Sequence, residues 1–323
     1  MEMHPAPFHS DVADGPDTGV AHWLTTSDGV RIRMAHWRAA NEKGTVLMFP
    51  GRTEYIEKYG RAADEFGERG YAMLAIDWRG QGLADRLIDD RAAGYVEEFS
   101  DYQKDIAAVL EAAEKLELPK PYFVIGHSMG GCIGLRAVMS GLPVNAAVFS
   151  APMWGILMSS LMRPAAWAMS WGSKKTGIGH KLAPGTKSKT YVLAEPFDGN
   201  TLTRDIEMFR YMQDQVTSYP DLALGGPSMH WLHEALVEMR ELSQMPAPDV
   251  PCLTFLGDSE QIVDPARIHK RMEGWSNGTL DIVKDGEHEV MMEVPETRDR
   301  VFTNAAAFFD AHLGDGGAQR TSA

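Results

Sequence analysis

The sequence predicts an α/β fold in which a mainly parallel central sheet carries helices on both faces. Two observations support this prediction. Short apolar runs typical of buried strands alternate with longer segments whose apolar residues recur at helical spacing, which is the pattern of parallel strands joined by helices. In addition, residues 122–138 run from an apolar strand through a glycine-rich turn directly into a helix.

The alternation holds over the first half of the chain. The expected strands are 22–25, 30–34, 45–49, 71–76, 122–125 and 145–149. The expected helices are 59–69, 101–116 and 131–138. Ser-Asp-Gly at 27–29 is a hairpin turn between the first two strands, and Gly70 and Pro119 end the helices that precede them.

The alternation then stops and later resumes. Residues 152–245 contain helical and irregular pieces but no clear strand, and the pattern returns with strands 252–256 and 280–283 and helices 266–272 and 297–313. A long insertion between two strands of one sheet is most simply a lid over the active-site edge. We therefore expect a core formed by residues 20–151 and 246–314, a lid at 152–245, and flexible tails at 1–19 and 315–323.

Composition limits the partners and the compartment. The formal net charge of -14 argues against nucleic acid as a partner. The two cysteines, Cys132 and Cys252, lie far apart and form no disulfide framework, which indicates a reducing compartment. The first residues lack the basic start and apolar stretch of a signal peptide, and no apolar stretch is long enough to cross a bilayer. We expect a cytoplasmic protein, with peripheral contact to the inner membrane left open.

The glycine-rich turn at 126–130 reads Gly-His-Ser-Met-Gly and carries the main functional signal. A strand, a Gly-x-Ser-x-Gly turn and a helix are the layout of a nucleophile elbow, in which a sharp turn exposes a serine at the edge of a sheet. The glycines prevent collisions with the flanking strand and helix. The motif predicts that Ser128 is a nucleophile, and the alternative is an ordinary strand-to-helix turn.

A serine hydroxyl needs a base and an oriented carboxylate, and in this arrangement both follow the serine in the chain. His288 directly follows the last expected strand and is the predicted base, although the neighbouring glutamates also suit a surface histidine. In the loop after strand 252–256, Glu260 is the preferred acid and Asp258 the alternative. Asp264 precedes a proline and suits a helix N-cap.

An oxyanion hole needs two backbone N–H groups directed at the developing negative charge. One is expected from Met129, which follows the nucleophile, and the other from Arg52 in the turn after strand 45–49. The alternative for the second is a simple turn with a solvated arginine. This mechanism requires no metal and no cofactor.

Together the elbow, the Glu260 loop and the His288 loop resemble the α/β-hydrolase superfamily. More narrowly, the chain resembles the bacterial lysophospholipase and monoacylglycerol lipase group, and the lysophospholipase branch in particular. The segments that carry this resemblance are 50–54, 57–59, 77–82, 150–156, 200–205 and 224–227. The resemblance implies an enzyme that cleaves the ester of a single-acyl lipid through an acyl-enzyme. Glu260 is a departure, because most of the group has aspartate there.

Residues 153–171 are dense in methionine and tryptophan, which suit variable acyl chains, so Met153 and Trp154 are expected at the substrate. Packing within the lid is the alternative. From residue 119 to 194 there is no Asp or Glu, and the lid part of this stretch is basic. Its cations are Arg163, Lys174, Lys175, Lys181, Lys187 and Lys189. These charges suit a membrane surface or a lipid phosphate, or they belong to a solvated loop.

Three functions remain open on the sequence alone. A lysophospholipase is preferred. A monoacylglycerol lipase or general carboxylesterase is the nearest alternative, and a non-catalytic lipid-binding protein on a hydrolase fold is the alternative from another class. The head group, the acyl length and the oligomeric state are not specified by the sequence.

Overall fold

A single sheet forms the centre of the molecule in the computed structural model, which describes residues 2–314. Its strands are β1 (His4–Pro5), β2 (Val20–Thr25), β3 (Arg31–Trp37), β4 (Thr45–Phe49), β5 (Ala72–Asp77), β6 (Tyr122–His127), β7 (Ala146–Ser150), β8 (Cys252–Gly257) and β9 (Gly278–Val283). They lie in the order β1-β2-β3-β5-β4-β6-β7-β8-β9. The pairs from β1 to β5 are antiparallel and those from β5 to β9 are parallel. The predicted mainly parallel sheet is confirmed.

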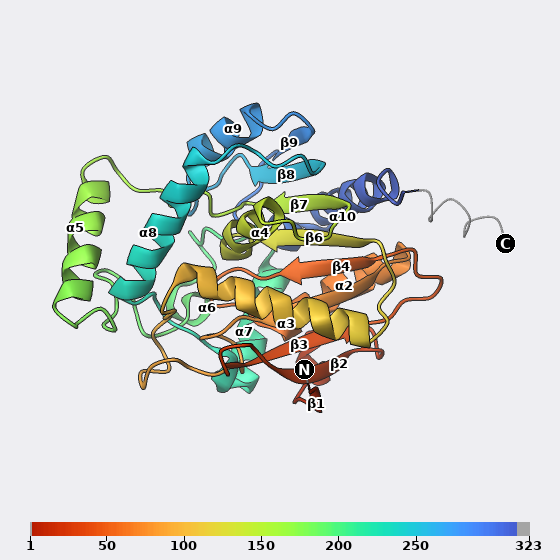
Figure 1. Cartoon of the computed structure of the whole chain (residues 1–323), viewed down its shortest axis with the longest axis horizontal. Coiled ribbons are helices and arrows are strands. Elements are labelled where there is room, and N and C mark those ends of the chain that lie inside the picture. The colour runs from red at the N-terminus through yellow and green to blue at the C-terminus, as the bar shows by residue number, and fades with distance from the viewer. Residues whose placement is uncertain (1, 315–323) are drawn as a thin grey trace.

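The central strands are apolar along their whole length because both faces of the sheet are covered. Every residue of β4, β5, β6 and β7 is buried. Helices α3 (Tyr102–Lys115) and α4 (Met129–Met139) lie on one face, and α2 (Gly60–Glu68) and α10 (Pro295–Asp310) lie on the other (Figure 1). Two clusters of buried side chains, one on each face, form the core.

The chain between β7 and β8 is helical. It contains α5 (Met162–Lys175), α6 (Tyr191–Ala194), α7 (Ile206–Ser218) and α8 (Met229–Gln244). Helix α5 packs against α8 at one end of the molecule (Figure 1). Because β7 and β8 are neighbours in the sheet, with Ala147 opposite Cys252, these helices leave the sheet and return to it at adjacent positions.

The remaining helices are short or lie at the edges of the sheet. They are α1 (Ser10–Ala13), α9 (Pro265–Glu273) and the 3-10 turns η1 (Ile56–Tyr59), η2 (Phe99–Asp101), η3 (Pro220–Leu222) and η4 (Val290–Met292). No helix within residues 2–314 is both long enough and apolar enough to cross a membrane.

The N-terminal segment differs from the flexible tail expected at residues 1–19. Strand β1 pairs with β2, and α1 packs against α7 and η1. The hydroxyl of Tyr211 donates to the carbonyl of Ala13, and the side-chain amide of Gln215 donates to the carbonyl of Val12. Polar composition did not reveal this packing, because the partners lie some 200 residues away in the chain. The second expected tail, 315–323, lies outside the described residues.

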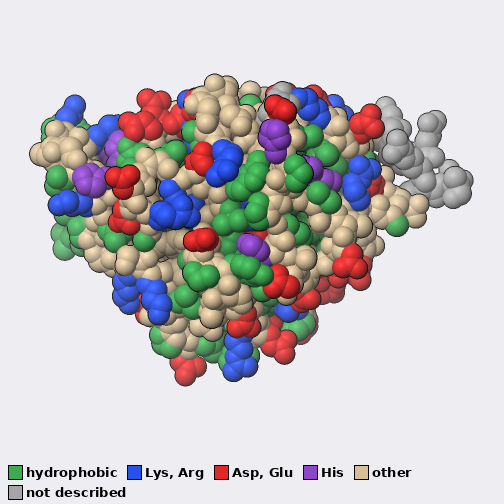
Figure 2. Space-filling model, turned by 90° about the horizontal axis from the view of Figure 1, so that it is seen from below, with side chains coloured by type: hydrophobic (Ala, Val, Ile, Leu, Met, Phe, Trp, Pro, Cys, Tyr) green, Lys and Arg blue, Asp and Glu red, His purple; other side chains and the backbone are tan. Residues whose placement is uncertain are grey.

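Acidic and basic side chains are interspersed on the face seen in Figure 2, and no field of lysine and arginine covers it. The excess of carboxylates is therefore not offset by a basic patch on this face.

Candidate active site

The carboxyl ends of the parallel strands bring four loops to one edge of the sheet. The loops after β4, β6, β8 and β9 hold Arg52, Ser128, Glu260 and His288 respectively. In open α/β sheets, ligands bind at this edge. The strand order places β4 beside β6 and β8 beside β9, so loops far apart in sequence meet there.

Ser128 sits at a sharp turn between β6 and α4. Its backbone has φ 49° and ψ -117°, a conformation that residues with a side chain seldom adopt. The backbone N–H of Ser128 donates to the carbonyl of Ser150, and the carbonyl of Ser128 accepts from Met153. These bonds to the segment at the end of β7 hold the turn in place. A strained serine between a strand and a helix is the geometry of a nucleophile elbow.

Two glycines make the turn possible by allowing backbone segments to touch. A Cβ atom at Gly130 would lie 1.9 Å from the carbonyl oxygen of Phe49 at the end of β4. A Cβ atom at Gly126 would lie 2.7 Å from the carbonyl oxygen of Gly130. The glycines of the motif therefore follow from close packing of α4 against β4 and β6.

His288 and Glu260 form a buried pair. The distance from Nδ1 of His288 to Oε2 of Glu260 is 2.7 Å, and the second carboxylate oxygen accepts the N–H groups of Ile262 and Val263. Burial opposes ionisation of Glu260, but the bonds from His288 and these N–H groups outweigh it and hold its pKa below the usual value. A carboxylate at Nδ1 fixes the ring orientation and leaves Nε2 available as a base.

The other carboxylates of the same loop point elsewhere. Asp258 is exposed, and its carboxylate accepts from the hydroxyl of Ser259. Asp264 caps α9 through a bond from the N–H of Ala266, as the sequence predicts. Of the two candidate acids, the structure brings Glu260 and not Asp258 to His288.

Ser128 and His288 open into the same cavity, which has a volume of about 770 Å³. Its walls are mainly apolar and come largely from the 152–245 segment. They include Met153, Ile156, Leu157, Met158, Met162, Ala166, Met169, Val192, Leu202, Met212, Val216 and Trp231. Methionine-rich walls adapt to chains of different shape.

Met153 lines this cavity, whereas Trp154 does not line it, contrary to the sequence prediction. The ring N–H of Trp154 donates to the carbonyl of Gly131 at 3.1 Å, and its ring stacks on Trp275. Trp154 is therefore a core residue that fastens the start of the 152–245 segment to α4. Met153 and Trp154 are neighbours in the chain, yet in this irregular segment one lines the cavity and the other packs in the core.

Arg52 and Met129, the two expected oxyanion donors, both lie at the carboxyl edge of the sheet. Met129 is the first residue of α4, where a backbone N–H has no partner within the helix. Arg52 lies in the turn after β4 and lines the cavity. In the same turn the N–H of Gly51 donates to the carboxylate of Glu54, which orders the backbone around Arg52.

Behind the site lies a buried charge cluster that sequence reasoning missed, formed by Glu54, Lys58, His127 and Glu289. The ammonium of Lys58 lies 2.5 Å from Glu54 and 2.6 Å from Glu289. Nε2 of His127 lies 3.5 Å and 3.3 Å from the same two carboxylates. The members come from the turn after β4, the end of β6 and the loop after β9, so the cluster links the three. In the sequence, the cluster is signalled only by the four-residue spacing of Glu54 and Lys58, which suits an ion pair.

Charge pairing sets the protonation of this cluster. Burial opposes a charge on His127, but Glu289 and Glu54 outweigh it and raise the pKa of His127 above its usual value. The pKa of Glu289 lies well below its usual value: burial opposes ionisation, and the charges of His127 and Lys58 prevail. Glu54, His127 and Glu289 are close enough to hold a metal ion together, but Lys58 already supplies positive charge between the two carboxylates.

Three of the six basic side chains that the sequence analysis named in the 152–245 segment form ion pairs. Lys174 pairs with Glu234, Lys187 with Glu195, and Arg163 with Asp264. The sequence pattern missed these pairs because all three carboxylates lie beyond residue 194 in the chain. The same segment exposes large apolar side chains, which are Leu157, Leu161, Met162, Met169, Trp171, Ile178 and Ile206.

The sheet, the elbow and the loops at its carboxyl edge define an α/β-hydrolase. A family model described as serine aminopeptidase, S33, matches residues 40–295, which is more than half of the chain. The chain belongs to this family, and it is an enzyme, a serine hydrolase of carboxylic esters.

The similar proteins are named for lipid substrates. Lysophospholipase L2 of Escherichia coli is 28% identical over 311 residues, which cover 92% of this chain and 89% of that protein. A monoacylglycerol lipase of Mycolicibacterium smegmatis is 27% identical over 265 residues, 76% of this chain and 80% of that protein. A solved structure of Saccharomyces cerevisiae monoglyceride lipase matches the fold with a TM-score of 0.70 at 20% identity, over 90% of this chain and 94% of that one.

Proposed function

We propose that this lipid ester hydrolase is a lysophospholipase, which releases the fatty acid of a single-acyl phospholipid. The observation that carries the proposal is the buried His288–Glu260 pair beside the cavity into which Ser128 opens. The apolar walls of the cavity suit one acyl chain, and the chain covers most of the length of the lysophospholipase it resembles. A monoacylglycerol lipase or a general carboxylesterase is the second candidate, favoured by the similarity to the mycobacterial and yeast enzymes.

In the proposed mechanism, Ser128 attacks the ester carbonyl while His288 accepts its proton. Glu260 orients the imidazole and stabilises its cationic form. The N–H groups of Arg52 and Met129 donate to the oxyanion of the tetrahedral intermediate. His288 then protonates the leaving alcohol, an acyl-enzyme remains on Ser128, and water activated by His288 releases the fatty acid.

The 152–245 segment is proposed to be a lid that also contacts the membrane. The segment supplies most of the apolar cavity wall, and its outer surface carries the exposed apolar residues of α5. Lys175, Lys181 and Lys189 make no ion pair within residues 2–314 and remain available to anionic lipid. Exposed apolar side chains beside free lysines are typical of a surface that rests on a bilayer.

The proposal is tested with Ser128→Ala and a substrate panel. Ser128→Ala should reduce turnover by at least about a thousandfold while the far-UV circular dichroism spectrum stays unchanged, since only the hydroxyl is removed. A fluorophosphonate probe should label the wild-type serine and not the variant. Full activity in the variant would refute the catalytic role, and a folded wild type that neither binds the probe nor hydrolyses esters would favour the non-catalytic lipid-binding alternative.

The panel compares lysophosphatidylcholine, monoolein and p-nitrophenyl butyrate. A lysophospholipase should show its highest kcat/KM on lysophosphatidylcholine. A higher value on monoolein would assign the second candidate instead, with the same Ser128 chemistry.

A further inference from the structure

Two basic side chains, Lys58 and Arg52, line the cavity that holds Ser128. Lys58 is neutralised by direct bonds to Glu54 and Glu289, the two carboxylates in the cavity wall. Arg52, the other cation of the wall, has no carboxylate within 4 Å among residues 2–314. The cavity therefore has one basic side chain whose charge is not balanced.

The guanidinium of Arg52 is held in place but not saturated with hydrogen bonds. Its Nη1 donates to the carbonyl of Gly225 at 2.8 Å, and its Cζ lies 5.6 Å from the ring centre of Trp231. Nε and Nη2 make no hydrogen bond to any residue from 2 to 314. An arginine has five N–H donors in a planar fork, so several remain free to bind an anion.

The surroundings of this guanidinium make it receptive to negative charge. Burial among protein atoms disfavours its cationic form and lowers the pKa of Arg52 to about 10, so the charge is retained at neutral pH. A desolvated cation without a counter-ion is unfavourable. An oxyanion that accepts two of its N–H groups would relieve this and form a strong charge-assisted contact.

The position of Arg52 indicates which anionic group of a substrate its guanidinium could bind. Its backbone belongs to the proposed oxyanion turn, while its side chain reaches Gly225 and Trp231, on the wall formed by the chain before and within α8. In a lysophospholipid the phosphate lies a few bonds from the ester, on the side of the leaving alcohol. A monoacylglycerol has a neutral hydroxyl at the same place.

We propose that the Arg52 guanidinium binds the phosphate of the head group and so makes the cavity selective for lysophospholipids over neutral monoacylglycerols. This inference rests on the proposed function, and it adds a recognition residue to it. The phosphate is common to all lysophospholipid head groups, so one arginine would serve them all.

The test is a comparison of two substrates in three variants. Arg52→Gln keeps the backbone N–H and a polar side chain, but it removes the charge and the guanidinium. The ratio of kcat/KM on lysophosphatidic acid to that on monoolein, both below their aggregation concentrations, should fall at least tenfold. Arg52→Lys, which keeps the charge without the planar fork, should lower the ratio less. An unchanged ratio in Arg52→Gln would overturn the proposal.

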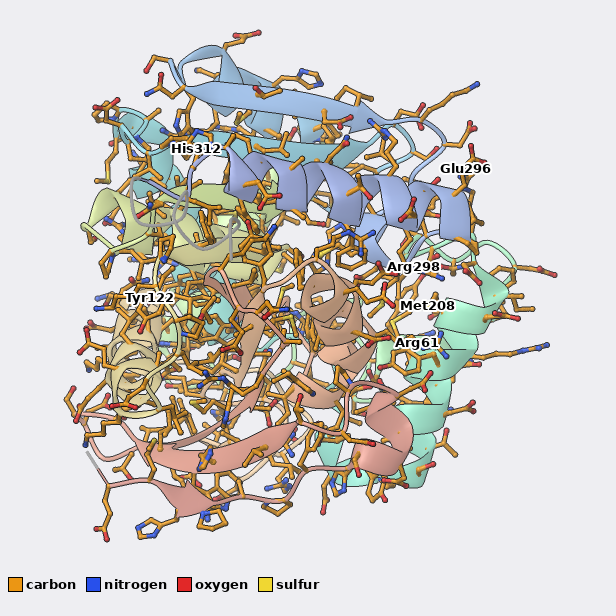
Figure 3. All side chains as sticks on the ribbon, turned by 90° about the vertical axis from the view of Figure 1, so that its right-hand side faces the viewer. Arg61, Tyr122, Met208, Glu296, Arg298 and His312 are labelled. Atoms are coloured by element: carbon orange, nitrogen blue, oxygen red, sulfur yellow. The ribbon has the colours of Figure 1, made fainter. Side chains whose placement is uncertain are left out.

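A matched control removes an arginine on another face. Arg61 lies on α2 beside Met208 of α7 (Figure 3) and pairs with Asp14. It does not line the cavity that holds Ser128. Arg61→Gln changes the net charge equally and should leave the ratio within twofold. A fall in this control as large as that of Arg52→Gln would show that net charge alone sets the ratio.

A second measurement does not depend on lipid turnover. Glycerol 3-phosphate should inhibit p-nitrophenyl butyrate hydrolysis by the wild type at least tenfold more strongly than it inhibits Arg52→Gln, whereas glycerol should inhibit neither. Equal inhibition of both proteins would contradict a phosphate contact at Arg52. If the wild type hydrolyses none of these esters, the proposed function itself fails, and that result is distinct from an active enzyme whose selectivity ignores Arg52.

Discussion

Glu260 and Asp258 show what decides a catalytic assignment at the scale of single residues. Both lie in one loop after β8, two positions apart, and both are carboxylates. Glu260 is 7% exposed and bonded to His288, whereas Asp258 is exposed to solvent. The backbone of the loop directs Glu260 rather than Asp258 toward His288, because the N–H groups of Ile262 and Val263 bond the carboxylate of Glu260.

Substitution of the two acids should therefore give very different results. Glu260→Gln retains an oxygen for the N–H groups of Ile262 and Val263 but removes the charge that supports a cationic His288. We expect kcat on p-nitrophenyl butyrate to fall about a thousandfold, with little change in melting temperature. Asp258→Asn should leave kcat within about twofold, because its carboxylate faces solvent. The reverse order of effects would make Asp258 the acid.

The sequence placed some site residues better than others for physical reasons. The positions of Ser128 and His288 could be predicted because each lies in the loop after a strand, where position along the chain specifies position at the sheet edge. Trp154 and the guanidinium of Arg52 could not, because their partners, Gly131, Trp275 and Gly225, come from distant segments. Local pattern carries no information about which distant backbone a side chain reaches.

At the scale of elements, buried strands and amphipathic helices were predicted well, and their ends agree within a few residues. Helix α3, expected at 101–116, spans Tyr102–Lys115. Strand β1 was missed because it has two residues, one of them proline, and depends wholly on pairing with β2. Short elements of this kind are stabilised by tertiary contacts rather than by their own propensities.

Helix α5 and the residues before it carry exposed apolar side chains that we expect to bind membranes. Leu161 is 86% exposed and Trp171 is 57% exposed, on a segment that packs against α8 with its other side. Replacing both with serine should weaken binding to vesicles of phosphatidylcholine and phosphatidylglycerol about tenfold, because apolar area no longer enters the bilayer. Co-sedimentation measures this directly.

The control for the vesicle experiment is Ile282→Ser, which removes an apolar side chain that is 42% exposed on β9, at the sheet edge. It should leave vesicle binding unchanged. Lys175→Gln combined with Lys181→Gln should reduce the dependence of binding on anionic lipid. Wild-type binding that does not respond to the loss of Leu161 and Trp171 would place the membrane contact on another surface.

At the scale of the whole molecule, the sheet brings charged groups from distant segments into buried pairs, and this couples stability to pH. Glu260 and Glu289 both have pKa values below the usual value: burial opposes their ionisation, but His288 prevails for Glu260 and His127 for Glu289. His127 has a raised pKa, because Glu289 and Glu54 outweigh burial. These groups link the loops after β4, β6, β8 and β9, so their protonation acts on the whole carboxyl edge.

The sign of each contribution follows from linkage. A carboxylate with a lowered folded pKa stabilises the fold above its unfolded pKa of about 4.3, and this stability is lost as the pH falls through the folded value. A histidine with a raised folded pKa stabilises the fold below its unfolded pKa of about 6.5, and this is lost as the pH rises through the folded value. Maximum stability is therefore expected between about pH 5 and 7.

Glu289→Gln tests this coupling by differential scanning calorimetry as a function of pH. At pH 6 the variant should melt several degrees below the wild type, since Lys58 and His127 lose one of their two carboxylates. Below about pH 4.3 the difference should shrink, because the unfolded chain then takes up a proton at Glu289 while the lowered pKa of the folded carboxylate resists it. Glu287→Gln, in the same loop, is the control: burial raises the pKa of Glu287, so removing its charge should not lower the melting temperature at pH 6. A gap between Glu289→Gln and wild type that stays constant down to pH 2 would mean that the charge of Glu289 does not stabilise this edge of the sheet.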